Sequence, residues 1–153
     1  MSLDAVLSAF VAKVAHLLRG PRTMRGSRGA GQRWEDLAAR HLRRQGYRIL
    51  ARNYRAGPGE IDFIAMEGRV LCFIEVKGRG GAGFGLPEES VNEEKQRRIH
   101  RAAEAWLQSA RPAAGLRRFD VVAILDLNGA VSIRLFRGAF EAPSRPHALP
   151  RRR

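Results

Sequence analysis

The pattern of hydrophobic and polar residues predicts a pair of adjacent strands near the middle of the chain. The runs Glu60–Met66 and Val70–Lys77 are apolar and rich in β-branched side chains, a composition typical of buried strands. Glu67-Gly68 lies between the two runs and has the character of the central residues of a tight turn. We therefore expect the runs to pair antiparallel as a hairpin.

Apolar residues spaced by three and four predict three helices. The first covers residues 1–20, and the second runs from about Gln32 to Gln45. The third begins near Ser90 and Glu93, which have the spacing of a capping box, and runs to about Gln108.

Three further extended segments complete the predicted sheet. Tyr47–Tyr54 precedes the hairpin, and Arg117–Leu125 is a buried strand reached through the third helix, so the connection is a crossover to a parallel position. Asn128-Gly129 is a strong hairpin signal, and Ala130–Phe136 should return as an antiparallel edge strand. The sequence thus predicts an α/β fold with a mixed sheet flanked by helices.

The length of the chain, 153 residues, fits one domain with a real core. We expect an amphipathic helix over 1–20, a basic Gly-rich linker over 21–31, the folded domain over 32–140 and a basic Pro-rich tail over 141–153. We expect the first helix to pack on its own domain, with docking on a partner or on a membrane surface as the alternatives.

The charge of the chain points to a polyanionic partner. Lys and Arg outnumber Asp and Glu by 28 to 15, a formal charge of +13, which favours nucleic acid first and an anionic membrane surface second. The single cysteine, Cys72, can form no internal disulfide, which suits a reducing cytoplasm. The sequence contains no run of eighteen or more apolar residues, so we expect no transmembrane span. A homodimer is compatible with the sequence.

Charged residues in the hairpin mark a candidate site. Glu75 and Lys77 leave one face of their strand about 7 Å apart, with Asp62 across from them on the neighbouring strand, where Glu60 shares its face. A solvated strand end with paired charges is the ordinary explanation of a lone Glu-x-Lys. However, the run Val70–Ile74 is typical of a covered central strand, where charge is costly unless it binds something. We therefore favour a site for a hard metal cation.

Other polar residues have structural and functional interpretations side by side. Glu35 in the first turn of its helix complements the helix dipole or joins the site. The apolar stripe of the third helix, extended back one turn, turns Lys95 toward the sheet, although its ammonium group can also snorkel to water. We expect Asp120 to close a strand start structurally rather than bind metal. The Gly-rich loop over 78–87 lacks the ending of a P-loop.

The order of the predicted elements, with Asp on the second strand and Glu-x-Lys on the third, resembles the PD-(D/E)XK nuclease fold. More closely, the chain is similar to the YraN-type family of bacterial proteins, which is itself similar to archaeal Holliday-junction resolvases. The resemblance covers about residues 31 to 125, although Ile61 stands where the nuclease motif has proline. Six segments carry it: Gly31-x-x-x-Glu35-x-x-Ala38, Gly46-Tyr47-x-Ile49-Leu50-x-x-Asn53, Gly59-Glu60-Ile61-Asp62, Phe73-Ile74-Glu75-Val76-Lys77-x-Arg79, Lys95-x-x-Arg98-Ile99 and Arg118-Phe119-Asp120-Val121-Val122.

The resemblance implies a restriction-endonuclease-like αβββαβ core and a divalent metal site. Asp62 and Glu75, with the carbonyl group of Val76, would hold Mg²⁺ or Mn²⁺. Lys77 would orient the attacking water and offset charge on the scissile phosphate, while Glu35 would complete the site. A bound divalent ion lowers the pKa of water and neutralises charge that grows on phosphoryl oxygens.

We therefore expect a metal-dependent endonuclease that acts on DNA, as the resemblance implies. Arg55, Arg79, Lys95 and Arg98 would grip the phosphate backbone. Charge directed at the backbone, without an evident base-reading helix, implies selection of branched or single-stranded shapes over sequence. One alternative is a nucleic-acid-binding protein that keeps the fold without cleaving, and another is a scaffold whose first helix docks on a partner or membrane.

Overall fold

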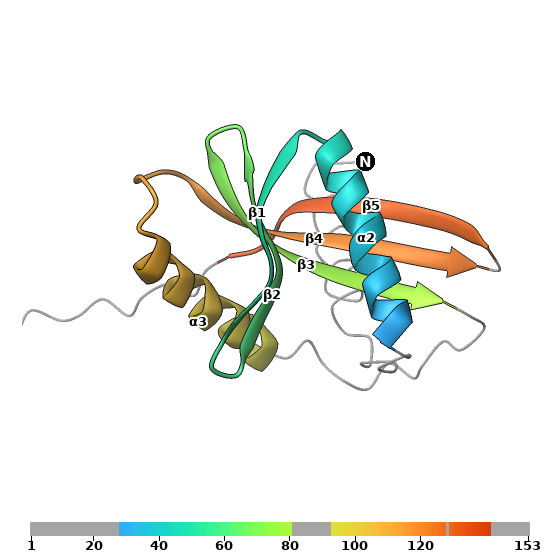
Figure 1. Ribbon diagram of the computed structural model, residues 1–153, viewed down its shortest axis with the longest axis horizontal. Coiled ribbons are helices and arrows are strands. Elements are labelled where there is room, and N and C mark those ends of the chain that lie inside the picture. The colour runs from blue at the N-terminus through green and yellow to red at the C-terminus, as the bar shows by residue number, and fades with distance from the viewer. Residues whose placement is uncertain (1–27, 81–92, 128, 142–153) are drawn as a thin grey trace, which may run out of the picture.

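The computed structural model describes residues 28–80, 93–127 and 129–141 (Figure 1). In these ranges a five-stranded sheet has its strands in sequence order. The elements are α2 (Arg28–Arg44), β1 (Tyr47–Ala56), β2 (Gly59–Glu67), β3 (Val70–Gly80), α3 (Glu93–Ala110), β4 (Arg117–Leu127) and β5 (Ala130–Phe140). The predicted helix over 1–20, Ser90 of the capping box, most of the Gly-rich loop and the tail beyond Glu141 lie outside the described residues.

The sheet is mixed, as expected. Strand β3 pairs parallel to β4, because α3 carries the chain over one face of the sheet between them, and the other neighbouring strands pair antiparallel. Strand β5 is an edge strand, also as expected, and it extends to Phe140 rather than ending at Phe136. The order of elements is that of the α/β restriction-endonuclease-like core.

The two helices cover different faces of the sheet because successive side chains of a strand point to opposite sides. Ala38 and Leu42 of α2 pack against Cys72 and Ile74 on one face. On the other face Ile99, Ala102 and Ala103 of α3 pack against Leu71, Phe73 and Phe119. Figure 1 shows α3 beside the β1–β2 hairpin. The helix therefore covers this face of the sheet mainly on the β2 side of β3 and less on the β4 side.

The turn between β2 and β3 lies one residue later than the sequence suggested. Glu67 pairs with Val70, so Gly68 and Arg69 are the central residues of the turn, not Glu67-Gly68. Gly68 has a φ of 57°, and a positive φ at the first central position is the geometry in which glycine is favoured. The side chain of Glu67 is instead used in ion pairs with Arg118 and Arg137.

Two glycines let the helices approach the strands closely. A Cβ atom on Gly59 of β2 would lie 2.4 Å from the carbonyl oxygen of Arg98 in α3. A Cβ atom on Gly78 of β3 would lie 2.4 Å from the ring of Trp34 in α2. Any larger residue would push the helices away from the sheet, so both glycines bring the helix starts to the strand segments that carry Asp62 and Lys77.

Asp120 of β4 is a structural residue, as expected. Its carboxylate is fully buried and accepts two hydrogen bonds from Arg118, at 2.7 and 2.9 Å. The hydroxyl group of Tyr47 donates a third at 3.0 Å, and the backbone N–H of Gly138 a fourth at 2.9 Å. These bonds tie the ends of β1, β4 and β5 together.

Candidate active site

The hairpin of β2 and β3 brings two carboxyl groups together. The backbone N–H of Val76 donates a hydrogen bond of 2.7 Å to Oδ2 of Asp62, and a side-chain hydrogen bond joins Asp62 to Glu75. Glu75 lies on the face of β3 that α3 partly covers and is only 7% exposed. The sequence placed these two residues across from one another on neighbouring strands, and the structure agrees.

Two lysines complete this cluster, which we call the Asp62–Glu75 site. The ammonium group of Lys77 lies 3.4 Å from Oε1 of Glu75, on the face that the period of a strand predicts for residues two apart. Lys95 in the first turn of α3 forms a hydrogen-bonded ion pair with the same oxygen. The inference that the stripe of α3 turns Lys95 toward the sheet is therefore confirmed.

Burial and mutual repulsion set the charge of the two carboxyl groups. Burial, and then the adjacent Glu75, raise the pKa of Asp62 well above its usual value, although the Val76 N–H opposes the shift. Burial alone would also raise the pKa of Glu75, but Lys95 and Lys77 outweigh it and hold that pKa below its ordinary value. Glu75 is thus the anionic partner, while Asp62 resists ionisation unless another positive charge arrives.

The two lysines respond differently to the same surroundings. Burial lowers the pKa of Lys77 to about 8, with the negative charge of Glu75 opposing the shift and the positive charge of Lys95 adding to it. For Lys95 burial acts in the same direction, but the ion pair with Glu75 prevails and raises its pKa. At neutral pH Lys95 is fully charged, and Lys77 is the lysine that loses its proton more readily.

Glu35 is held by a contact that the sequence did not predict. Its carboxylate accepts a hydrogen bond of 2.9 Å from the side-chain amide of Asn53 in β1. Asn53 has a φ of 50°, in the left-handed region that asparagine tolerates better than most residues. Because the neighbouring Trp34 packs on Gly78, Glu35 lies in the turn of α2 that approaches the end of β3. Its role as a member of the site stays a prediction.

The predicted phosphate-binding residues lie on β1, β3 and α3. Arg55 forms an ion pair of 3.3 Å with Glu60, and Arg98 pairs with Glu94 one helical turn earlier. Such exposed pairs contribute little stability, so a phosphate group could replace the carboxylate at small cost. The side chain of Arg79 lies outside the described residues.

The cluster supplies only part of a metal coordination sphere. Within residues 28–80, 93–127 and 129–141, no group of three or more His, Cys, Asp or Glu side chains is arranged to hold a metal ion. Two adjacent carboxyl groups nevertheless fit a hard divalent cation, which also takes backbone carbonyl groups and water as ligands.

In the part of the chain that the structure describes, no helix is long and apolar enough to cross a membrane.

Comparison with known protein sequences places the site within one family. Residues 34–124 match the sequence profile of the uncharacterised protein family UPF0102. A UPF0102 protein of Chlorobaculum tepidum is 52% identical over 98 residues, which are 64% of this chain and 76% of the relative. One from Syntrophotalea carbinolica is 46% identical over 110 residues, 71% of this chain and 89% of the relative.

A third relative, a UPF0102 protein of a Parafrankia species, is 43% identical over 118 residues, which cover 76% of this chain and all of that protein. The matched segment, residues 34–124, runs from the first turns of α2 to β4 and contains Asp62, Glu75, Lys77 and Lys95. It also begins just before Glu35, so every residue predicted for the site lies inside it. The chain therefore belongs to the UPF0102 family, as the resemblance to YraN-type proteins implied.

Proposed function

We propose that this protein is a metal-dependent nuclease that hydrolyses phosphodiester bonds in DNA. The observation that supports this most directly is the Asp62–Glu75 site, in which two carboxyl groups in contact share one buried face with a lysine of lowered pKa. Carboxylates and an ammonium group within reach of one another are the groups that phosphoryl transfer needs. Structural ion pairs do not require two adjacent carboxyl groups to be buried together.

Asp62 and Glu75 would hold Mg²⁺ or Mn²⁺, with the carbonyl group of Val76 as a further ligand. A divalent ion bound there would lower the pKa of a coordinated water molecule and neutralise charge on the phosphoryl oxygens. A cation would also offset the burial and the repulsion from Glu75 that raise the pKa of Asp62, so both carboxyl groups could then ionise. The ion pair between Lys95 and Glu75 would have to share Glu75 with the cation.

Lys77 would orient the attacking water and face the scissile phosphate. Its pKa of about 8 keeps the ammonium group charged in most molecules at pH 7, so it can donate hydrogen bonds to water and to a phosphate oxygen. Glu35 would approach from α2 once its hydrogen bond with Asn53 opens. Arg55, Lys95 and Arg98, with Arg79, would hold the backbone on either side.

DNA is the expected substrate because of the charge of the chain. A formal charge of +13 favours a polyanion, and contacts with phosphates position a duplex without reading its sequence. We therefore expect selection by shape, with branched or single-stranded DNA preferred.

A second candidate function is binding of nucleic acid without cleavage. One observation favours it: two of the three carboxylates expected to act in catalysis already have side-chain partners, Lys95 for Glu75 and Asn53 for Glu35. A protein that had lost the metal could be stable in this form while its arginines still bound phosphate.

Purified protein incubated with branched, nicked, single-stranded and duplex DNA in Mg²⁺ or Mn²⁺ separates the two functions. We expect cleavage that Asp62→Asn and Lys77→Ala each reduce by about 100-fold or more. Asp36→Asn is the matched control, since it removes a carboxylate from the exposed surface of α2. Cleavage that survives both site substitutions would come from a contaminant. Binding without cleavage in either metal would support the second function.

A further inference from the structure

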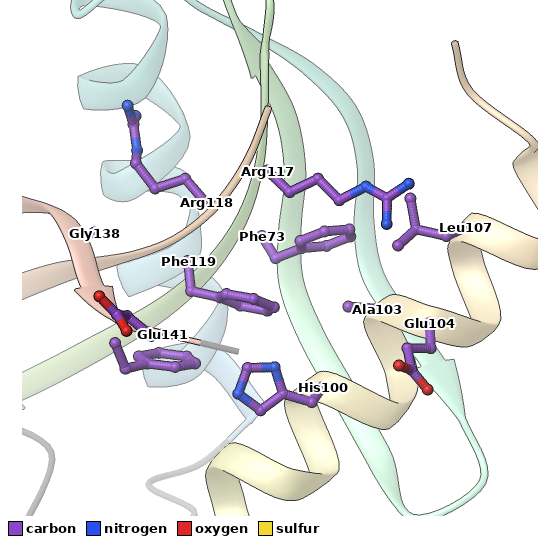
Figure 2. Close-up of a pocket in the computed structure, with 11 residues that line it drawn as sticks. Phe73, His100, Ala103, Glu104, Leu107, Arg117, Arg118, Phe119, Gly138 and Glu141 are labelled. Atoms are coloured by element: carbon purple, nitrogen blue, oxygen red, sulfur yellow. The ribbon is translucent and has the colours of Figure 1, made fainter. Parts of the chain in front are cut away.

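A cavity lies on the α3 side of the sheet, beside the Asp62–Glu75 site. Its volume is about 510 Å³, within the range of pockets that bind small organic molecules. Side chains from β3, α3, β4 and the end of β5 line it (Figure 2). Phe73 is the link between the two places, because it precedes Glu75 by two residues and leaves the same face of β3, about 7 Å away.

The wall of this cavity is a column of aromatic rings. Phe73 and Phe119 stack with centroids 5.4 Å apart, and Phe119 and Phe140 stack at 5.0 Å, with interplanar angles of 27° and 25°. His100 of α3 meets Phe119 edge to face at 4.4 Å, and Figure 2 shows its ring turned toward Phe119. These rings give the cavity an apolar aromatic wall, against which another flat ring can pack.

His100 is buried, at 8% exposed, and one of its two ring nitrogens lacks a hydrogen-bond partner among the described residues. Its Nε2 atom is shielded from solvent and has no hydrogen-bond partner in the part of the chain that the structure describes. Burial lowers the pKa of this imidazole, with the backbone of Glu141 opposing the shift. A neutral imidazole leaves Nε2 able to pair with a polar group of a bound molecule.

The mouth of the cavity carries two arginines. Arg117 extends alongside Leu107 at the rim (Figure 2) and is exposed, so it is accessible to an anionic group outside the cavity. Arg118 contributes part of its side chain to the lining while its guanidinium group is bound to Asp120 and Glu67. Glu104 and Glu141 also line the cavity, so a phosphate group would have to lie on the Arg117 side. An aromatic interior below this exposed arginine suits a flat heterocycle attached to a phosphate.

We propose that this cavity binds one unpaired nucleobase of the DNA substrate, next to the phosphate that enters the Asp62–Glu75 site. This inference rests on the proposed function, because it assumes that the polyanion is DNA. Stacking on aromatic side chains is tolerant of base identity, and a base must leave its stack to enter such a pocket. The pocket therefore explains a preference for branched or single-stranded DNA through the unpaired bases that these shapes offer.

The test is binding of duplexes that are identical except for one unpaired 2-aminopurine, measured by anisotropy and by 2-aminopurine fluorescence in EDTA. Without metal no cleavage interferes. We expect the duplex with the unpaired base to bind about tenfold more tightly than the fully paired one, the scale of one stacked base. The fluorescence of the unpaired base should change on binding.

Leu107→Glu is the informative variant because it puts a charge into the pocket wall, away from the Asp62–Glu75 site. Ser109→Glu is its matched control, adding the same charge at an exposed position of α3. We expect Leu107→Glu to abolish the preference for the unpaired base while binding of paired duplex matches that of Ser109→Glu. His100→Leu replaces the imidazole by an apolar side chain that lacks Nε2, and it should reduce the preference in part. Circular dichroism verifies that each variant is folded.

Equal affinity for both duplexes with unchanged fluorescence would overturn the pocket inference, even if the protein cleaves DNA. Failure to bind any DNA would overturn it together with the proposed substrate. If the wild-type protein does not cleave DNA but still prefers the unpaired base, the proposed nuclease activity is refuted and the pocket inference is retained. A preference that Leu107→Glu and Ser109→Glu reduce equally would assign the effect to surface charge and contradict the inference.

Discussion

Replacement of Asp120 by asparagine should destabilise the protein strongly without affecting the Asp62–Glu75 site. The side chain keeps its shape, but one carboxylate oxygen becomes an amide group that cannot accept a hydrogen bond. Asp120 is fully buried and accepts four hydrogen bonds, two of them from the Arg118 guanidinium. The change therefore leaves a partly buried cation facing a donor instead of an acceptor.

The expected loss follows from these contacts. Each charge-assisted hydrogen bond contributes about 1.5–3 kcal/mol, and breaking a buried ion pair from one side costs about 3–5 kcal/mol. Because asparagine retains one acceptor, we expect a loss of about 3 kcal/mol. With a urea m-value of about 2 kcal/mol per molar, the unfolding midpoint should fall by about 1.5 M.

Urea denaturation followed by circular dichroism measures this loss, with Asp36→Asn as the control. Asp36 is an exposed carboxylate on α2, so its substitution should change the free energy of unfolding by less than about 0.5 kcal/mol. Tyr47→Phe removes a single donor to Asp120 and should cost about 1 kcal/mol if the asparagine variant is too unstable to purify. A midpoint for Asp120→Asn equal to that of the control would refute the reasoning. Weaker Mg²⁺ binding with unchanged stability would make Asp120 a ligand instead.

Three further predictions concern the helix packing, the site and the pH dependence. Gly59→Ala should lower the free energy of unfolding by about 2 kcal/mol because its Cβ atom would overlap the Arg98 carbonyl oxygen. The control Gly31→Ala in α2, whose Cβ atom meets nothing within 4 Å, should raise it by about 0.5–1 kcal/mol. Thermal melts compare the two variants, and equal melting temperatures would contradict the close packing. Asp62→Asn should stabilise the protein in EDTA by about 1 kcal/mol, because the raised carboxyl pKa means that ionisation of Asp62 opposes folding as the pH rises. Mg²⁺ should stabilise the wild type but not the variant. A variant less stable than the wild type in EDTA would contradict this prediction. Arg137, then Arg118, lower the pKa of Glu67 from 4.5 to about 2, so the ionised Glu67 stabilises the fold fully above pH 4.5 and loses this effect as the pH falls toward 2. The difference in unfolding free energy between wild type and Glu67→Gln should shrink over that window from about 1–2 kcal/mol, and a difference independent of pH would contradict it.

Strand pairing and the face of Glu75 could be predicted from the sequence because they depend on local periods. Alternation along β3 fixes Glu75 and Lys77 on one side, and the stripe of α3 fixes the direction of Lys95. The position of a turn is less certain. Charge made Glu67 look like a turn residue, whereas long-range ion pairs with Arg118 and Arg137 hold it in the strand.

Contacts between distant segments could not be predicted in the same way. The hydrogen bond from Asn53 to Glu35 joins residues 18 apart, and no period in either element indicates it. The same holds for the ring column, where Phe140 lies beyond the predicted end of its strand and meets Phe119. The one feature of the sequence that singled out Asn53 was its place in the segment Gly46–Asn53, which carries part of the resemblance to YraN-type proteins.

The ion pair between Lys95 and Glu75 has a consequence for how the protein matures on the ribosome. Glu75 and Lys77 are synthesised before Lys95, which reaches them only when α3 docks on the sheet. Until then Glu75 lacks one of the two cations that offset the cost of burying its charge. The segment of β3 that carries Glu75 stays exposed to water on the face that α3 will cover. The buried charge cluster is therefore complete only after the crossover that creates the parallel pair of β3 and β4 has formed.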